Sequence, residues 1–273
     1  MAEHVRVSPQ WLVLREPADA AARSTELVEL LLPRLPATER LVVHDLGGGS
    51  GAMGRWLAPR LPGPQHWVVH DRDPDLLEEV LARPAGTAAD GTDVTVEVRR
   101  SDITQLTHDD LAGAGLVVAS ALLDMLTARE LTAMLHSCLE IGRCPVLLAL
   151  TVVGRVSLSP ADPLDARLAS AFDAHQRRTT AAGRLLGPDA TEAAVEVARA
   201  TGAEVHVRPS PWRLGADDEG LIAEWFDGWV GAACEQEPPL VGDADPYRAR
   251  RLEQAAAGEL SVIVDHSDVL VLP

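Results

Sequence analysis

A cluster of glycines directly after an apolar run is the part of this sequence most suited to holding a ligand. Residues 41–54 read LVVHDLGGGSGAMG, in which Asp45 is followed by five glycines. Glycine has no Cβ, so a ligand can approach the backbone N–H groups closely, and the turn can adopt torsions that other residues resist. A helix that opens behind such a turn adds further N–H donors. We therefore predict a cofactor-binding loop between a strand over 41–46 and a helix that starts at Ala52.

Two overlapping patterns predict different cofactors for this loop. Gly49, Gly51 and Gly54 form GxGxxG, and Asp71 lies about 20 positions further on, as in nicotinamide dinucleotide sites. Asp45 instead begins the pattern D-x-G-x-G-x-G. An acidic side chain is unfavourable beside a pyrophosphate but favourable beside a cationic ligand.

The second pattern resembles the first motif of the class I S-adenosylmethionine-dependent methyltransferases, and residues 40–152 follow that family in motif order. The resemblance implies that Asp45 helps to hold the amino-acid end of S-adenosylmethionine and that the Asp71 carboxylate accepts hydrogen bonds from both ribose hydroxyls. It also implies that Asp102 binds the adenine amino group. The cofactor-binding residues that it implies are Asp45, Gly47, Gly49, Gly51, Asp71, Asp102, Ile103 and Ser120. Asp45 and Asp102 are also typical turn residues, and that alternative stays open.

The elements that must position these residues alternate between strands and helices. Apolar runs predict strands at 41–46, 66–70, 94–98, 116–119, 146–152, 204–208 and 260–264, followed by a short apolar piece at 269–272. Helices are predicted behind Asp73-Pro74 and behind two capping boxes, Thr127 with Glu130 and Asp189 with Glu192. We predict an α/β fold with a doubly wound, Rossmann-like, seven-stranded sheet, mostly parallel with an antiparallel C-terminal strand.

Three segments lie outside this alternation. Residues 1–40 read as a helical cap in which Pro17 begins a helix. The domain at 41–273 carries two stretches, 154–188 and 209–259, that are too long for ordinary connections and are interpreted as insertions. We expect the cap and the insertions to cover the carboxyl edge of the sheet, where ligands of open α/β sheets bind.

The insertions contain the candidates for substrate chemistry. His175 continues an apolar stripe through Phe172 and is a candidate general base. Trp225 and Trp229 lie four residues apart and are candidates for a substrate pocket. A satisfied histidine and core tryptophans are the alternatives at these positions. Trp11, Trp212 and Arg15 are further candidates.

Composition excludes several other classes of function. The net charge of −17 disfavours nucleic acid as a partner. No apolar run reaches the about 18 residues of a membrane span, and the N-terminus does not read as a signal peptide, so we expect a cytoplasmic protein. Cys138, Cys144 and Cys234 have no metal-ligand spacing, and no carboxylate set for a metal is apparent.

The sequence thus predicts an enzyme that transfers the methyl group of S-adenosylmethionine to oxygen or nitrogen of a small molecule. A nicotinamide-dependent oxidoreductase and a non-catalytic cofactor-binding protein of the same fold remain alternatives. A small-molecule acceptor is the expected partner, and a homodimer remains open.

Overall fold

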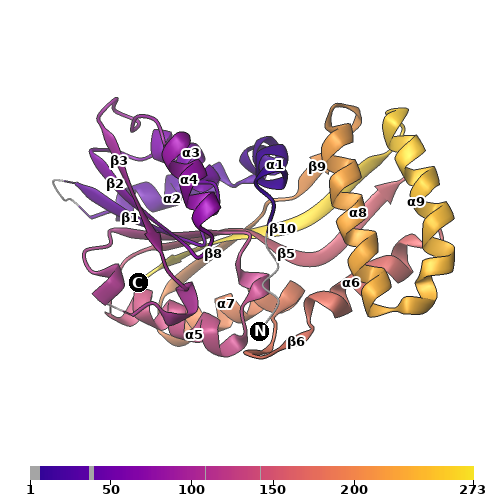
Figure 1. Ribbon diagram of the computed structural model, residues 1–273. Coiled ribbons are helices and arrows are strands. Elements are labelled where there is room, and N and C mark those ends of the chain that lie inside the picture. The colour runs from indigo at the N-terminus through magenta and orange to yellow at the C-terminus, as the bar shows by residue number, and fades with distance from the viewer. Residues whose placement is uncertain (1–6, 37–39, 108, 142) are drawn as a thin grey trace.

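One mixed sheet organises the chain in the computed structural model, which describes residues 7–36, 40–107, 109–141 and 143–273 (Figure 1). The strand order is β3-β2-β1-β4-β5-β10-β8, and a short strand, β9, also pairs with β10. The strands β1–β5 are parallel to their neighbours, whereas β10 is antiparallel to both β5 and β8. The predicted fold class is confirmed. The strand order reverses between β1 and β4, because β2 and β3 lie on one side of β1 and β4 and β5 lie on the other. Ligands of open α/β sheets bind at this point. The strands are β1 (Leu41–Leu46), β2 (Gln65–Asp71), β3 (Val94–Arg100), β4 (Leu116–Ser120), β5 (Val146–Ser159), β8 (Glu204–Pro209), β9 (Trp212–Leu214) and β10 (Ser261–Leu272).

Helices cover both faces of this sheet and produce two apolar cores (Figure 1). The helices α2 (Thr25–Leu31), α3 (Ala52–Leu57) and α4 (Pro74–Ala82) lie on one face, and α5 (Ala128–His136) and α7 (Ala190–Ala200) lie on the other. Val43 and Val118 point into the first core, whereas Leu46 and Val117 point into the second. A strand covered on both faces must be apolar nearly throughout, and this explains the continuous apolar runs in β1 and β4.

A third core lies at the far end of the sheet, where β5 and β10 continue as an arm and β9 pairs with β10. The helices α6 (Asp165–Gln176), α8 (Glu219–Gln236) and α9 (Val241–Ala256) pack on this arm (Figure 1). Only one face of the arm is covered there. Burial in β10 accordingly alternates from Ser261 to Ser267 and becomes continuous from Asp268 onward, where helices lie on both sides.

The arm corrects two of the predicted strand boundaries. The strand predicted at 146–152 extends to Ser159, so the first part of the 154–188 stretch is strand. The pieces predicted at 260–264 and 269–272 form the single strand β10, with register shifts between Val264 and His266 and between Ser267 and Val269. The polar residues between the two pieces mark bulges within one strand, not a loop.

The N-terminal segment also differs from its prediction. Pro17 does not begin a helix: it lies inside α1 (Pro9–Ala22), which starts at Pro9 behind the N-cap Ser8. A proline removes one backbone donor within a helix. Here the carbonyl that loses its partner belongs to Val13, which is 48% exposed and can bond water instead. Positions 1–6 and 37–39 of the predicted helical cap lie outside the described residues.

One of the two predicted capping boxes forms. Thr127 and Glu130 make both reciprocal hydrogen bonds at the start of α5. Asp189 precedes α7 but makes no capping bond, because its carboxylate pairs with Arg177 at 2.6 and 2.7 Å. The ion pair therefore takes the place of the second box.

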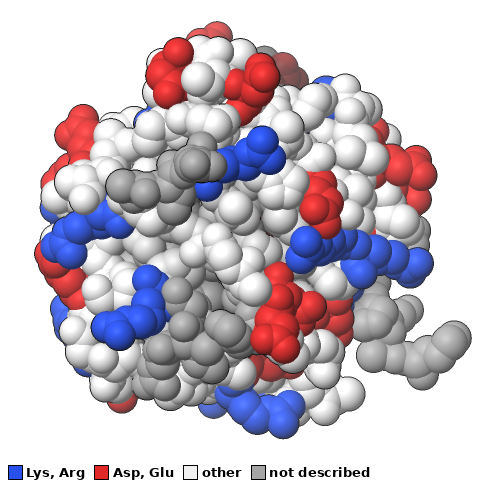
Figure 2. Space-filling model, turned by 90° about the vertical axis from the view of Figure 1, so that its left-hand side faces the viewer, with Lys and Arg blue, Asp and Glu red and all other residues white. Residues whose placement is uncertain are grey.

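Charged side chains are dispersed over the side of the molecule that lies at the left in Figure 1. Figure 2 shows Arg side chains there among acidic and uncharged residues, without one continuous basic surface. None of the helices in the described part of the chain combines the length and the apolar character that crossing a bilayer requires.

Candidate functional site

The glycine loop lies at the carboxyl end of β1, between β2 and β4. Gly47, Gly49 and Gly51 have φ values of 64°, 55° and 81°, in the left-handed region that favours glycine. The chain then enters α3 directly at Ala52. The sequence therefore uses its glycines to turn the backbone sharply and to leave one wall of the sheet edge without side chains.

Asp45 lies beneath this loop and has no polar partner. Its side chain is 0% exposed, and neither carboxylate oxygen accepts a hydrogen bond from a described residue. Burial raises the pKa of Asp45 to about 7, against the opposing attraction of Arg23. A buried carboxylate without a donor is costly in a folded protein. A cationic donor would satisfy both the charge and the open acceptor positions of this carboxylate.

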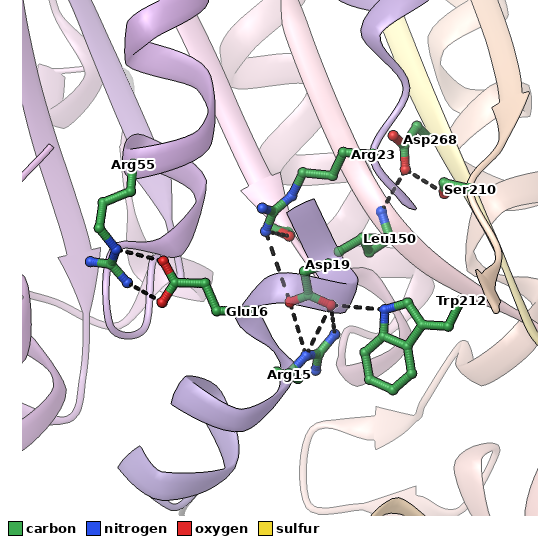
Figure 3. Close-up of polar contacts among 10 residues, drawn as sticks. Arg15, Glu16, Asp19, Arg23, Arg55, Leu150, Ser210, Trp212 and Asp268 are labelled. Atoms are coloured by element: carbon green, nitrogen blue, oxygen red, sulfur yellow. Dashed lines mark hydrogen bonds and ion pairs between the residues drawn. The ribbon is translucent and has the colours of Figure 1, made fainter. Parts of the chain in front are cut away.

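Arg23 is the cation that most strongly attracts Asp45. It ends α1, is 4% exposed, and its Nη2 donates to the Ser120 Oγ at 3.1 Å. The same nitrogen lies 3.9 Å from the Asp19 Oδ2 (Figure 3). Its Nε and Nη1 are buried without a partner in the described structure. Sequence analysis missed Arg23, because nothing local distinguishes it from the other arginines.

Asp71 closes β2 and holds the glycine loop in place. Its Oδ2 accepts a hydrogen bond from the Gly49 N–H at 2.9 Å, and its Oδ1 accepts one from the Asp73 N–H at 2.9 Å. Each carboxylate oxygen can accept a second hydrogen bond. Asp71 is half-buried, so those remaining positions are open to a ligand.

Asp102 follows the neighbouring strand β3, at the same edge of the sheet. Its Oδ1 accepts bonds from the Thr104 N–H at 3.0 Å and from the Thr104 hydroxyl at 2.8 Å, so it caps the short turn that begins at Ile103. Asp102 is exposed and Ile103 is half-buried. The structure therefore brings Asp71, Asp102 and Ile103 to the ends of two paired strands.

The helix α1 lies across the glycine loop. A Cβ on Gly49 would come within 3.3 Å of the Leu12 Cδ1. Glu16 of α1 forms two hydrogen bonds of 2.7 Å with Arg55 of α3 (Figure 3). These bonds to the Arg55 guanidinium lower the pKa of Glu16. The N-terminal segment is thus part of the site, and it supplies Arg23 to it.

A cavity of about 190 Å³ lies between α1, the β5–β10 arm, α6 and α8. Ala121, the residue after Ser120, is part of its wall, so the cavity begins where the glycine-loop site ends. Trp225 and Trp229 line it as a stacked pair with ring centroids 5.3 Å apart and an interplanar angle of 18°. The other aromatic wall residues are Trp11, Phe172 and Trp212.

Polar groups without partners also line this cavity. Among the described side chains, the Gln176 Oε1, the Trp229 Nε1 and the His266 Nδ1 are buried and make no hydrogen bond. Burial lowers the pKa of His266 to about 4 and raises those of Asp124 and Asp173 to about 6. Unsatisfied polar atoms around an apolar pocket are the usual form of a small-molecule site.

Comparison with solved structures finds proteins of similar fold. The cyclopropane synthase MmaA2 from Mycobacterium tuberculosis superposes with a TM-score of 0.50 at 15% identity, over 97% of this chain and 94% of that protein. The chain has the fold of the S-adenosylmethionine-dependent methyltransferases. A methyltransferase from Thiobacillus denitrificans, solved with S-adenosyl-L-homocysteine, aligns with a TM-score of 0.46 at 14% identity, over 98% and 99% of the two chains. The sequence matches no family model, and no curated protein matches it.

The methyltransferase fold gathers most of the predicted residues but leaves His175 outside the cavity wall. Phe172, Asp173 and Gln176 of α6 line the cavity, whereas the His175 Nε2 lies 3.2 Å from the Glu235 Oε2 of α8. The role of His175 as a general base therefore stays a prediction, and its side chain is not part of the cavity wall. Among the residues that the structure describes, no group of three His, Cys, Asp or Glu side chains could hold a metal ion.

Asp124 and Asp173 were not predicted as site residues. Asp124 follows β4 in the short turn Leu123–Met125, and Asp173 lies on α6 against β5. A Cβ on Gly154 would come within 2.7 Å of the Asp173 Oδ2, which shows how closely this carboxylate approaches the strand. Asp173 lies two residues before His175 on α6, and the helical stripe alone could not decide which of the two faces inward.

Proposed function

We propose that this protein is a methyltransferase that uses S-adenosylmethionine to methylate oxygen or nitrogen of a small molecule held in the cavity. One observation carries the proposal: a buried carboxylate below the glycine loop and a buried guanidinium that attracts it, Asp45 and Arg23, both have side-chain atoms without a partner in the described structure. The amino-acid end of S-adenosylmethionine has an ammonium and a carboxylate, and so presents the two complementary charges. A dinucleotide pyrophosphate would leave Asp45 facing another anion.

The residues at the sheet edge fit the rest of the cofactor. Asp45 would accept from the ammonium, and the free Nε and Nη1 of Arg23 would donate to the carboxylate. Asp71 would accept from the ribose hydroxyls with its remaining lone pairs, and Asp102 and Ile103 would lie against adenine. When bound, the cofactor supplies an electrophilic methyl group on a sulfonium. The chain supplies position and charge.

The neighbouring cavity would hold the acceptor. Transfer of a methyl group is an in-line displacement, so the acceptor atom must be held on the side of the methyl carbon opposite the sulfur. Ser120 contacts Arg23 of the cofactor site, and Ala121 lines the cavity, so adjacent residues border both ligands. Asp124 is a better candidate than His175 for the group that takes a proton from the methyl acceptor, because Asp124 lines the cavity.

The test is transfer itself, measured by mass spectrometry with S-adenosylmethionine that carries a deuterated methyl group and a panel of phenols, amines and thiols. We expect a labelled product together with S-adenosylhomocysteine, and at least about a tenfold lower rate at sub-saturating donor in Asp71→Ala. Asp217→Asn, an exposed position outside both sites, serves as the control. Binding of NAD without binding of S-adenosylmethionine would reject the proposal. Donor binding without transfer to any acceptor would favour a non-catalytic binding protein.

A further inference from the structure

The charges that line the cavity do not balance. Arg15 is held by Asp19, with its Nε 3.0 Å from the Oδ2, and Arg155 is held by Asp265 at 3.1 Å. Asp124 and Asp173, also on the wall, form no ion pair with another described residue. Arg177, the cation whose attraction reaches Asp173, is already paired with Asp189 at 2.6 Å.

Both unpaired carboxyl groups carry charge at neutral pH. Burial raises the pKa values of Asp124 and Asp173 only to about 6. Arg15 and Arg178 attract Asp124, and Arg177 attracts Asp173, but among the described residues none of these cations forms an ion pair with either carboxylate.

The aromatic wall has the same preference for a cation. The face of an indole attracts a positive charge, and desolvation strengthens that attraction. The cavity already contains one example, because the Arg15 guanidinium lies 4.9 Å from the ring centroid of Trp212 and 5.8 Å from that of Trp11. Trp225 stacks on the buried Trp229 and is itself half-buried, and neither ring has a guanidinium over it within the described structure. Trp225 is therefore the ring of this pair that a ligand in the cavity can reach.

The unpartnered polar atoms add a second requirement. The Gln176 Oε1 can accept a hydrogen bond from an ammonium, whereas the Trp229 Nε1 needs an acceptor. A cavity of about 150 Å³ is known to hold benzene. A volume of about 190 Å³ therefore fits one ring with a short chain.

We propose that the cavity binds a compact primary or secondary amine as its ammonium, between Asp124, Asp173 and the stacked Trp225 and Trp229, and that its nitrogen is the methyl acceptor. This rests on the proposed methyltransferase function and names the substrate class for it. Phenols and carboxylic acids are excluded as preferred substrates, because their anions would face two carboxylates.

The reaction balances with the groups present. The bound ammonium gives one proton to the Asp124 carboxylate and becomes a neutral amine. The amine lone pair forms the bond to the methyl carbon while the carbon–sulfur bond breaks, and that electron pair stays on sulfur. The sulfonium charge passes to the nitrogen, and Asp124 releases its proton to solvent. Raising the pKa of Asp124 makes it a stronger base for this step.

The experiment measures binding of three matched probes to the protein saturated with S-adenosylhomocysteine. The probes are 2-phenylethylamine, its neutral counterpart 2-phenylethanol and the anion phenylacetate. We expect the amine to bind at least about tenfold more tightly than the alcohol, and phenylacetate not to bind. Asp124→Asn and Asp173→Asn should each lower the affinity for the amine about 10- to 100-fold and leave the affinity for the alcohol unchanged. Asp227→Asn, on the solvent side of α8, should change neither.

Two results would overturn the inference. One is equal or tighter binding of the alcohol or the acid, and the other is no binding of the amine at millimolar concentration. Titration of S-adenosylhomocysteine in the same experiment separates this failure from failure of the proposed function. If S-adenosylhomocysteine binds and the amine does not, the substrate class is wrong and the methyltransferase proposal stands. If S-adenosylhomocysteine does not bind, the proposed function fails and the amine proposal falls with it as a substrate assignment.

Discussion

Replacement of Asp45 with asparagine should stabilise the free protein while it weakens cofactor binding. Burial raises the pKa of Asp45 from 3.8 to about 7. A shift of about three units corresponds to about 4 kcal/mol of cost for keeping this group ionised in the folded chain. Asparagine removes the charge but leaves an amide without a partner, which costs about 1–3 kcal/mol. We therefore expect Asp45→Asn to raise the free energy of unfolding by about 2 kcal/mol at pH 8.

The sign of this effect depends on pH. The folded chain binds the Asp45 proton more tightly than the unfolded chain, so the contribution of this group to stability falls as pH rises from 3.8 to about 7 and is constant above that. The advantage of the asparagine variant should therefore shrink at pH 5, where the folded parent is already protonated. Urea unfolding at pH 8 and pH 5 measures both values, with Asp217→Asn as the control.

Cofactor affinity should change in the opposite direction. The variant loses a charge-assisted hydrogen bond to the ammonium, so its affinity for S-adenosylhomocysteine should fall about 10- to 100-fold in calorimetry at pH 8. Two results would refute this reasoning. A less stable variant at pH 8 would mean that Asp45 has a partner in the free protein, and unchanged affinity would mean that it does not face the ligand.

Three further changes have defined outcomes. Arg23→Met should weaken S-adenosylhomocysteine by at least about tenfold in calorimetry, because the carboxylate of the ligand loses its donors; unchanged affinity would exclude Arg23 from the site. Asp268→Asn should lower the free energy of unfolding by about 2–4 kcal/mol in urea, because the carboxylate accepts from the Leu150 N–H at 2.8 Å and the Ser210 hydroxyl at 2.6 Å (Figure 3), and from the Ser24 N–H at 2.7 Å. A loss below about 1 kcal/mol would contradict this role of Asp268. His44 and His70 lie 3.0 Å apart with pKa values lowered to about 4 by burial, so stability should fall as pH drops from about 6.5 to 4. In His44→Gln that fall should be smaller by about 1 kcal/mol per pH unit, and an identical pH profile would show that the pair does not titrate on unfolding.

Local patterns predicted the strand–turn–helix geometry around the glycine loop. Asp45, the glycine turn and Asp71 lie within one strand–turn–helix unit and the next strand, so their spacing reflects contacts between near neighbours. The same holds for the capping box at Thr127. Continuous apolar runs located β1 and β4 because helices cover both faces of those strands.

The substrate half depends on contacts between distant segments. Arg23 reaches Ser120 across 97 residues, and no pattern near either residue indicates that pairing. The cavity forms where α1, the β5–β10 arm, α6 and α8 meet. The arm itself was predicted as separate pieces, because the bulges in β10 bring polar residues such as Asp265 and Asp268 into an otherwise apolar strand.

In the proposed function, the Asp45 carboxylate and the unpartnered Nε and Nη1 of Arg23 hold the amino-acid end of S-adenosylmethionine. The most direct test compares S-adenosylhomocysteine with 5′-methylthioadenosine, which lacks that end, by calorimetry on the parent and on Asp45→Asn. We expect the parent to bind S-adenosylhomocysteine at least about 100-fold more tightly than 5′-methylthioadenosine, and Asp45→Asn to lose most of this preference. Equal binding of the two ligands to the parent would contradict it.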